Sequence, residues 1–352
     1  MRHKESQLRE NQENSMILII TNKEDAHPTP VIERLSARGV PVFRLNTEAL
    51  LTDYEFCWQV DAAGEITFRI RCRLNGLETT GREITAVWDR RPEKPNELPY
   101  PSTPEIDRHN REEALGFLVF LRYWLREIPS IGSIVNDRPA ASKMLQYAIA
   151  REVGFKIPRS CFSNVKAPFL DMSRECTDLI LKPIDVCDIW DEKQGVDYVF
   201  YAQKTPAASL REVPDEAFSQ TVSFVQEYIE KAFELRVTVV GKEVFACKID
   251  SQAQQEDTGR IDWRQGYEHG LRQEAYALPD SVASQCVAFL RRMGLNFGCF
   301  DFIVTPSGEY VFLECNPNGQ WLWLELTVGL KISEAIADFL QNPSAKQISV
   351  ES

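Results

Sequence analysis

The stretch "CFDFIVTPSGEYVFLECN" (residues 299–316) decides the fold, because it reads as two apolar strands around a turn. Pro306-Ser307-Gly308-Glu309 supplies turn chemistry between two runs rich in aromatic and β-branched residues, which predicts a β-hairpin. Counting outward from a four-residue turn gives the residues that face one another across the strands. The predicted pairs are Thr305 with Tyr310, Ile303 with Phe312, and Asp301 with Glu314.

Asp301 and Glu314 therefore lie on the polar face of this hairpin, with Cβ atoms about 4.5–5.5 Å apart. Like charges so placed repel unless a cation lies between them. Asn316 shares their face and adds a neutral oxygen, so the three residues predict a Mg²⁺ site. The alternative is that both acids are solvent-exposed or pair with lysine or arginine. The other face is expected to be core and comprises Phe300, Phe302, Val304, Val311, Leu313 and Cys315.

The bulk composition narrows the class of protein. The chain has 352 residues, enough for two or three domains, with a net charge of −12. This acidic balance argues against a general nucleic-acid binder. The sequence has no apolar run of about 18 residues or more, so it predicts no membrane-spanning helix. Residues 1–15 are polar and lack the apolar core of a secretory signal, so we expect them to form a mobile extension.

Cysteine and histidine usage points to a reducing compartment and away from zinc. The nine cysteines are scattered and form no CxxC pair, which favours a cytoplasmic location. The four histidines show no ligand spacing, so a zinc site is improbable.

The pattern along the chain predicts a mixed α/β (α+β) protein of three domains. "MILIITNKEDAHPTPVIERLSARGVPVFRLN" (16–46) reads as strand, helix, strand, with the helix ending at Gly39. We expect an N-terminal α/β domain at 16–130, a central domain at 131–225 and a C-terminal domain at 226–345. Further expected elements are helices at 108–127, 136–153, 279–298 and 332–341, and strands within 55–75 and at 84–92, 179–185 and 196–204. Residues 223–250 are expected to give a strand, a crossing segment and then two strands joined at 240–242.

Cations near the predicted metal face would be needed to hold a polyphosphate. Lys143 lies on the helix expected at 136–153, and Lys182 lies in the apolar strand "LILKP". Arg236 alternates with Glu234 on one strand face and could neutralise phosphoryl oxygens. Each of the three has an ordinary alternative. Lys143 could lie on a solvated helix face, and Lys182 could be a strand-end lysine that reaches water. Arg236 could form a structural pair with Glu234. Arg264, in "DWR", is weak evidence alone.

The order of these motifs resembles that of the ATP-grasp ligases. No glycine-rich phosphate loop of the GxxxxGK[ST] or GxGxxG type is present, so neither a P-loop nor a Rossmann fold is supported. Over residues 16–340 the chain is most similar to the microviridin-type peptide ligases, or graspetide synthetases. The motifs that carry this likeness are "VWDRRP", "NDRPAASKMLQYAIAREVGFKIP", "ELRVTVVGKEVFACKIDSQ", "DWR" and "NPNGQWLWLEL". Asp89 departs from the family in "VWDRRP", where relatives often have an aromatic residue.

The resemblance implies an ATP-grasp fold, with a pre-grasp domain, a small central domain and a C-terminal domain built on an antiparallel sheet. It also implies the site residues. ATP phosphates are expected at Lys143 and Lys182, the adenine edge at Glu227, Tyr228 and Ile229, and the ribose at Glu234. Arg236 and Arg264 are the expected catalytic arginines, Asp301, Glu314 and Asn316 the Mg²⁺ ligands, and Asn318 the substrate contact.

The implied reaction has two steps and a peptide substrate. ATP phosphorylates an Asp or Glu side chain of a ribosomally made precursor peptide, and a Ser, Thr or Lys side chain of that peptide then displaces phosphate. The products are ω-ester or ω-amide macrocycles, and the enzyme is expected to be a homodimer. Two other readings stay open: a carboxylate–amine ligase acting on free amino acids or a protein tail, as glutathione synthetases and ribosomal-protein glutamate ligases do, and an ATP-binding module without turnover. Trp321 and Trp323 are expected in the core, with a peptide site as the alternative.

Overall fold

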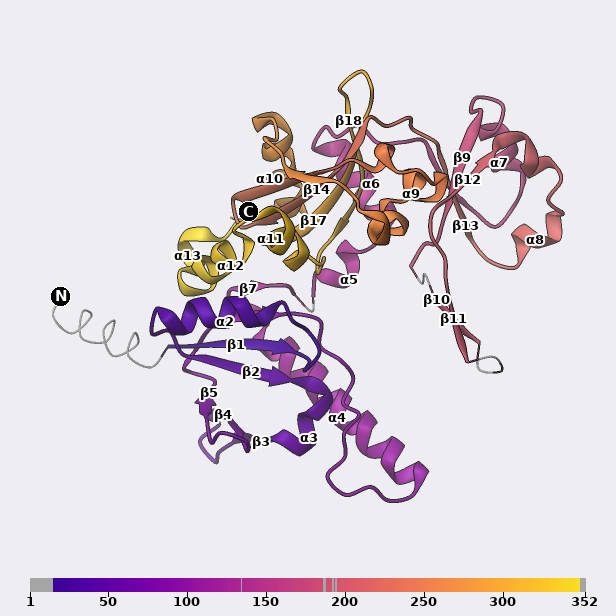
Figure 1. Cartoon of the computed structure of the whole chain (residues 1–352). Helices are drawn as coiled ribbons and strands as arrows, with labels where there is room; N and C mark the ends of the chain where they lie inside the picture. The colour runs from indigo at the N-terminus through magenta and orange to yellow at the C-terminus, as the bar shows by residue number, and fades with distance from the viewer. Residues whose placement is uncertain (1–14, 134, 186–187, 192, 194, 349–352) are drawn as a thin grey trace.

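A computed structural model of the chain describes residues 15–133, 135–185, 188–191, 193 and 195–348 (Figure 1). The mobile extension predicted for residues 1–15 lies outside these ranges, apart from Ser15. Within them, no helix has both the length and the apolar character needed to cross a membrane.

The N-terminal part is built on a parallel sheet with strand order β2-β1-β6-β7. Strand β1 (Met16–Thr21) is buried along its whole length, as its unbroken apolar sequence predicts. Its side chains alternate between two cores: Ile17 and Ile19 pack with helix α2, while Leu18 and Ile20 pack with helix α4. The elements here are α2 (Pro28–Ala37), β2 (Val42–Asn46), α3 (Leu50–Asp53), β3 (Tyr54–Val60), β4 (Ile66–Cys72), β5 (Glu78–Thr80), β6 (Ile84–Asp89), α4 (Pro104–Trp124) and β7 (Ser130–Ile131).

Helix α4 begins four residues before the predicted start at residue 108. The Thr103 hydroxyl accepts the Ile106 N–H at 3.4 Å, and Pro104 occupies the first turn, where its missing N–H costs nothing. The Pro-rich loop before α4 is therefore shorter than predicted.

The central part is an antiparallel sheet with strand order β12-β9-β13-β8. Its elements are β8 (Ser160–Ser163), α7 (Ala167–Met172), β9 (Asp178–Lys182), β12 (Gln203–Pro206), α8 (Asp215–Ser219) and β13 (Ser223–Glu227). The strand predicted at 196–204 is wrong as a single element. Its first part, β11 (Val196–Val199), pairs with β10 (Asp188–Asp191) in a hairpin that extends away from the sheet, and only its end enters β12 (Figure 1).

The C-terminal part is a five-stranded antiparallel sheet with strand order β16-β15-β14-β17-β18. One face packs on α6 and α10, and the other packs on α12. The remaining elements are β14 (Phe233–Val240), β15 (Glu243–Ile249), α9 (Asp257–Ile261), β16 (Gln273–Ala275), α10 (Asp280–Met293), β17 (Phe297–Val304), β18 (Tyr310–Asn316), α11 (Leu322–Val328), α12 (Ile332–Gln341) and α13 (Pro343–Lys346).

The single helix predicted over residues 136–153 is wrong, because the chain forms two helices there. Helix α5 (Asp137–Ala140) ends, and α6 (Lys143–Glu152) starts afresh with Ser142 as its N-cap. The Ser142 hydroxyl accepts the Leu145 N–H at 3.5 Å. The break places Lys143 at the start of α6. The predicted end of the helix at Gly154 is confirmed by its left-handed φ of 86°.

Helix α12 packs the N-terminal part of the chain against the C-terminal part. It lies against α2 on one side and against β14 of the large sheet on the other, in one continuous apolar core. Arg34 of α2 donates to Ser333 Oγ at 2.7 Å and to Glu334 at 2.8 Å. Arg38 donates to Asp338 at 2.7 Å. The N-terminal sheet is thereby fixed below the C-terminal sheet (Figure 1).

The predicted domain limits stay a prediction. Helix α6 falls in the predicted central domain, yet its Tyr147, Ile149 and Ala150 pack in the core of the large sheet.

Candidate active site

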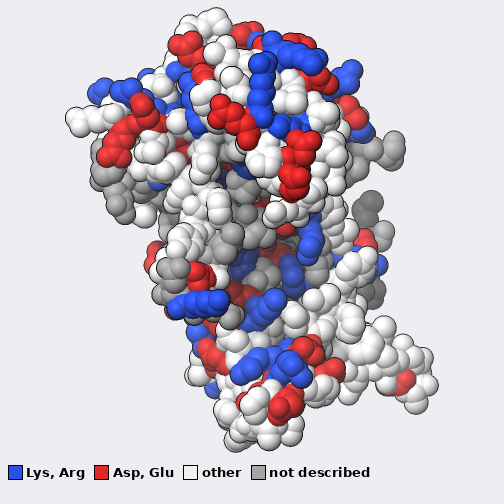
Figure 2. All heavy atoms as spheres, turned by 90° about the vertical axis from the view of Figure 1, so that its right-hand side faces the viewer, with Lys and Arg blue, Asp and Glu red and all other residues white. Residues whose placement is uncertain are grey.

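A cavity of about 990 Å³ opens between the three sheets, and all predicted site residues line it. Figure 2 shows Lys and Arg side chains gathered in this hollow. The predicted residues that meet there are Lys143, Lys182, Glu227, Tyr228, Ile229, Glu234, Arg236, Arg264, Asp301, Glu314, Asn316 and Asn318.

The predicted pairing of Asp301 with Glu314 is confirmed, but the count that led to it was wrong. Val304, not Thr305, faces Tyr310, so the loop is one residue longer than predicted. A β-bulge between Asp301 and Phe302 then restores the register, because Leu313 is an extra residue in β18. The further pairing of Ile303 with Phe312 and the core assignment of Leu313 are wrong: Phe302 faces Phe312, Phe312 lies in the core, and Leu313 lines the cavity.

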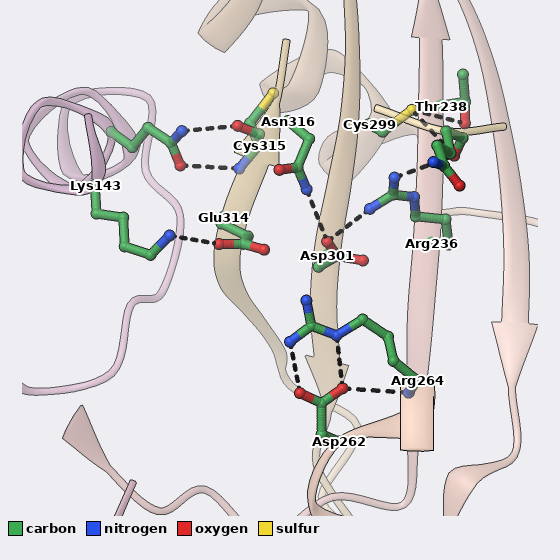
Figure 3. Close-up of polar contacts among 12 residues, drawn as sticks. Lys143, Arg236, Thr238, Asp262, Arg264, Cys299, Asp301, Glu314, Cys315 and Asn316 are labelled. Atoms are coloured by element: carbon green, nitrogen blue, oxygen red, sulfur yellow. Dashed lines mark hydrogen bonds and ion pairs between the residues drawn. The ribbon is translucent and has the colours of Figure 1, made fainter. Parts of the chain in front are cut away.

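Asp301 is held from two sides (Figure 3). Arg236 Nη1 donates to its Oδ2 at 2.7 Å, and Asn316 Nδ2 donates to the same oxygen at 3.3 Å. Burial raises the pKa of Asp301, and the Arg236 guanidinium opposes that rise. The other carboxylate oxygen, Oδ1, is buried without a hydrogen-bond partner among the described residues. A buried carboxylate oxygen in that state is costly unless a cation binds it.

Glu314 lies beside Asp301 and faces Lys143, whose Nζ donates to Glu314 Oε2 at 3.0 Å (Figure 3). Burial alone would raise the pKa of Glu314, but the ammonium groups of Lys143 and Lys182 lower it to about 2. The Gln146 side chain fixes this geometry: its amide donates to Cys315 O at 2.7 Å and accepts Cys315 N–H at 2.9 Å. The start of α6 is thereby tied to the end of β18.

The donor set fits Mg²⁺. Two carboxylates and the side-chain amide oxygen of Asn316 are hard oxygen ligands, and Asp301 Oδ1 is available for a cation. Three or more His, Cys, Asp or Glu side chains do not gather at any place in the described part of the chain. Asn316 adds a neutral oxygen beside the two carboxylates.

The opposite end of the cavity lies between β9, β13 and β14. Lys182 Nζ donates to Gln226 Oε1 at 2.9 Å, and burial lowers the pKa of Lys182. Glu234 accepts from Lys231 at 2.8 Å. Lys231 also lines the cavity and was missed, although "EKAFEL" places it three residues before Glu234.

The expected adenine edge follows directly after β13. Glu227 accepts the backbone N–H of Arg159 at 2.8 Å, and the Tyr228 N–H donates to Asp178 O at 3.1 Å. The Tyr228 ring lies 3.9 Å below Lys204 Nζ. These contacts hold the segment between the central and large sheets in one conformation.

Arg264 is oriented by the first residue of its own motif. Asp262 accepts from Arg264 Nε at 2.8 Å and from Nη2 at 2.5 Å, in a two-pronged contact that raises the pKa of Arg264 (Figure 3). Trp263 packs on Trp323 with ring centroids 5.4 Å apart, and both line the cavity. The core prediction is thus confirmed for Trp321, which is fully buried, whereas Trp323 lies at the cavity wall.

Asn318 is gripped by two residues that lie far away in the sequence. Arg90 Nη1 donates to its carbonyl at 2.6 Å, and Asn318 Nδ2 donates to Asp137 Oδ2 at 2.6 Å. The next residue, Gly319, has no room for a side chain: a Cβ would lie 2.4 Å from Cys299 Cβ and 2.8 Å from Arg236 Nη2. The "NPNG" sequence therefore turns tightly beneath the metal ligands.

Arg90 belongs to a buried network that sequence reasoning missed. Its Nε lies 3.1 Å from Asp25, whose other oxygen lies 2.8 Å from His27 Nδ1. His27 Nε2 accepts the backbone N–H of Trp321 at 3.3 Å. The three charged residues that end the apolar stretch "AVWDRR", Asp89, Arg90 and Arg91, were the available signal. Asp89, the acid of this stretch, lies 2.8 Å from Arg122 of α4 and so has a structural partner.

The comparisons with known proteins agree with this geometry. Residues 16–131 match the MvdD pre-ATP grasp domain, and residues 172–340 match the RimK-like ATP-grasp domain. A comparison with curated protein sequences gives no match.

Among solved structures, the chain is similar to macrocyclase MdnC from Microcystis aeruginosa MRC, bound with precursor peptide MdnA. The identity is 27% and the TM-score 0.78, over 93% of this chain and 99% of that one. It is also similar to a RiPP-associated ATP-grasp ligase of Chryseobacterium gregarium, in complex with ADP and a leader and core peptide. Here the identity is 26% and the TM-score 0.84, over 96% of this chain and 100% of that one. Macrocyclase MdnB from Microcystis aeruginosa MRC gives 28% identity and a TM-score of 0.68, over 93% and 99%.

Proposed function

Since this chain is an ATP-grasp ligase of the graspetide-synthetase type, we propose that it closes rings in a ribosomally made precursor peptide, with ATP and Mg²⁺ as cofactors. The bonds formed are ω-esters or ω-amides between side chains of that peptide. The observation that carries the proposal is the carboxylate face of Asp301 and Glu314, flanked by Lys143 and Arg236 inside one cavity.

The residues of the two sheets divide the work of holding the nucleotide. Lys143 and Lys182 bind the phosphates of ATP, and Glu234 binds the ribose hydroxyls. The segment Glu227–Ile229 meets the adenine edge through side chain and backbone. Asp301, Glu314 and Asn316 hold Mg²⁺, which supplies charge neutralisation for the terminal phosphates when bound. The support is that all of these residues line one cavity, with the cations beside the carboxylates.

The first chemical step transfers the terminal phosphoryl group to a carboxylate of the peptide. A carboxylate oxygen attacks phosphorus, the bond to the bridging oxygen breaks, and ADP leaves with that electron pair. Arg236 and Arg264 stabilise the charge on the transferring group, because both guanidiniums are held in fixed orientation by an aspartate. The product is an acyl phosphate of an Asp or Glu side chain.

The second step closes the ring. A hydroxyl or amine of the same peptide attacks the acyl carbon, loses its proton, and expels inorganic phosphate. Asn318 lies next to the metal ligands and contacts the peptide there. Neither step requires a covalent enzyme nucleophile, so positioning and charge supply the catalysis. The buried cysteines Cys299 and Cys315 take no part, since burial raises the pKa of both thiols.

The test is direct. A short reading frame rich in codons for Thr, Ser, Lys, Asp and Glu is sought beside the gene. The enzyme is incubated with ATP, Mg²⁺ and the peptide that it encodes, and the product is analysed by mass spectrometry. Loss of one water per ring, with ADP formed only when the peptide is present, supports the proposal. ADP formation with free amino acids alone would favour the amino-acid ligase, and ATP binding without turnover on any acceptor would favour the binding module.

We further propose a cytoplasmic homodimer. The eight cysteines that the structure describes are free thiols, which suits a reducing compartment. Light scattering coupled to size-exclusion chromatography measures the oligomeric state.

A further inference from the structure

Two further arginines line the cavity: Arg91, in the loop after β6, and Arg138, in helix α5. Each side chain is exposed, and neither makes a hydrogen bond or an ion pair with a residue that the structure describes. Most other cavity arginines and lysines are already paired: Lys143, Lys182, Lys231, Arg236 and Arg264 each donate to an acid or an amide.

Arg91 and Arg138 each follow a residue that contacts Asn318. Arg90, the residue before Arg91, donates to the Asn318 carbonyl at 2.6 Å. Asp137, the residue before Arg138, accepts from the Asn318 side chain at 2.6 Å. Arg91 and Arg138 are thus the chain neighbours of the two residues that grip Asn318.

Arg91 has an unfavourable backbone conformation that its surroundings hold in place. Arg91 has a φ of 49°, and it is the one residue other than glycine with a positive φ in the described part of the chain. Such a conformation costs about 1 kcal/mol or more for a residue with a Cβ and persists where the surroundings impose it. Here Asn22 Nδ2 donates to the Arg91 carbonyl at 2.8 Å, and the buried Arg90 precedes it. The turn lets Arg90 point inward while Arg91 lines the cavity.

Both arginines line the same cavity as the proposed metal ligands and nucleotide residues. A planar guanidinium binds a carboxylate through two parallel N–H donors.

We propose that Arg91 and Arg138 form a carboxylate-binding subsite for an acidic side chain of the acceptor peptide, distinct from the carboxylate that is phosphorylated. It orients the peptide so that its neighbouring acid reaches the phosphoryl group. The inference rests on the proposed function, because it names how that substrate is recognised.

The test uses a defined probe, the fluorescein-labelled hexapeptide Glu-Thr-Glu-Thr-Glu-Thr, and its counterpart with Gln in place of Glu. Binding to the full-length enzyme with Mg²⁺ and ADP is measured by fluorescence anisotropy. The acidic peptide should bind more tightly than the neutral one, and R91Q and R138Q should each weaken it about 10-fold, as expected for one charged hydrogen-bonded contact. R82Q removes the same charge at an exposed site of the N-terminal domain and should leave binding unchanged.

Two results would overturn the subsite: equal affinity of the acidic and neutral peptides, or R91Q and R138Q affinities equal to that of R82Q. ADP affinity of each variant, measured in parallel, should equal that of the wild type, and a loss there would assign the arginines to the nucleotide instead. Failure of the proposed function looks different, because wild-type enzyme would then convert no peptide while the anisotropy difference remained measurable.

Discussion

Lys143 Nζ lies 3.0 Å from Glu314 Oε2, although 171 residues separate the two in the chain. The contact exists because α6 starts at Lys143 and because Gln146, one turn later, binds the backbone of Cys315. In the proposed function the same lysine also contacts the phosphates of ATP.

Replacement of Lys143 by methionine should weaken nucleotide binding. The variant loses a charged hydrogen bond worth about 1.5–3 kcal/mol, so we expect ATP affinity to fall about 10- to 100-fold. Isothermal titration calorimetry with Mg²⁺ and a non-hydrolysable ATP analogue measures this. Lys156→Met is the matched control, because that lysine is half exposed and pairs with Glu309 on the surface. Equal affinities of the two variants would contradict the assignment.

Asp301→Asn and Glu314→Gln should both abolish Mg²⁺-dependent turnover but differ in stability. The Asp301 change leaves the buried Arg236 without its anion, so the free energy of unfolding should fall by about 3 kcal/mol. Glu314 is 29% exposed, so water can solvate the Lys143 ammonium that its loss leaves, and the destabilisation should be smaller. Urea unfolding of the two variants measures the difference. Equal destabilisation would show that Arg236 does not depend on Asp301.

Gly319→Ala should reduce activity through the position of Asn318. The added Cβ would meet Cys299 Cβ at 2.4 Å, and neither backbone can move freely, so we expect about 1–3 kcal/mol of destabilisation. The rate of ring closure should fall as well. Gly116→Ala, in the middle of α4 with open space around the new methyl group, serves as the control and should not lower stability. Wild-type turnover in Gly319→Ala would refute the tight turn.

Stability should fall with pH on the acid side of neutrality because of His27. Burial lowers the pKa of His27 below its ordinary value of 6.5, against the opposing effect of Asp25. The unfolded chain therefore binds a proton near pH 6.5 that the folded chain takes up only at lower pH, so stability is lost as pH falls from 6.5. His27→Gln should flatten this part of the unfolding curve, measured by urea titration between pH 7 and 5. His109→Gln, at an exposed position, should not.

The pattern of the chain was enough to predict the core strands and the polar face of the hairpin. Strand β1 and the alternation of Leu235 and Val237 with Glu234 and Arg236 follow from local periodicity alone. The bulge at Leu313 could not be predicted in this way, because the extra residue in the loop and the extra residue at the bulge cancel. Asp301 therefore faces Glu314 both in the simple count and in the structure.

Two further features were missed, one local and one that depends on a distant segment. The break before Lys143 depends on Ser142 acting as an N-cap, which competes with the helix propensity of the surrounding residues. The role of Arg90 depends on a carbonyl 228 residues later, which no local signal identifies.

The position of α12 constrains how the protein is made. This helix, near the end of the chain, covers α2, near its beginning, and the apolar surfaces of Val31 and Leu35 pack with it in one core. During synthesis α12 leaves the ribosome after both the N-terminal sheet and the large sheet, so the first sheet stays uncovered on one side until α12 has been made. Nascent chains that stop before α12 should therefore be targets for chaperones and proteases, even though the N-terminal sheet is fully translated.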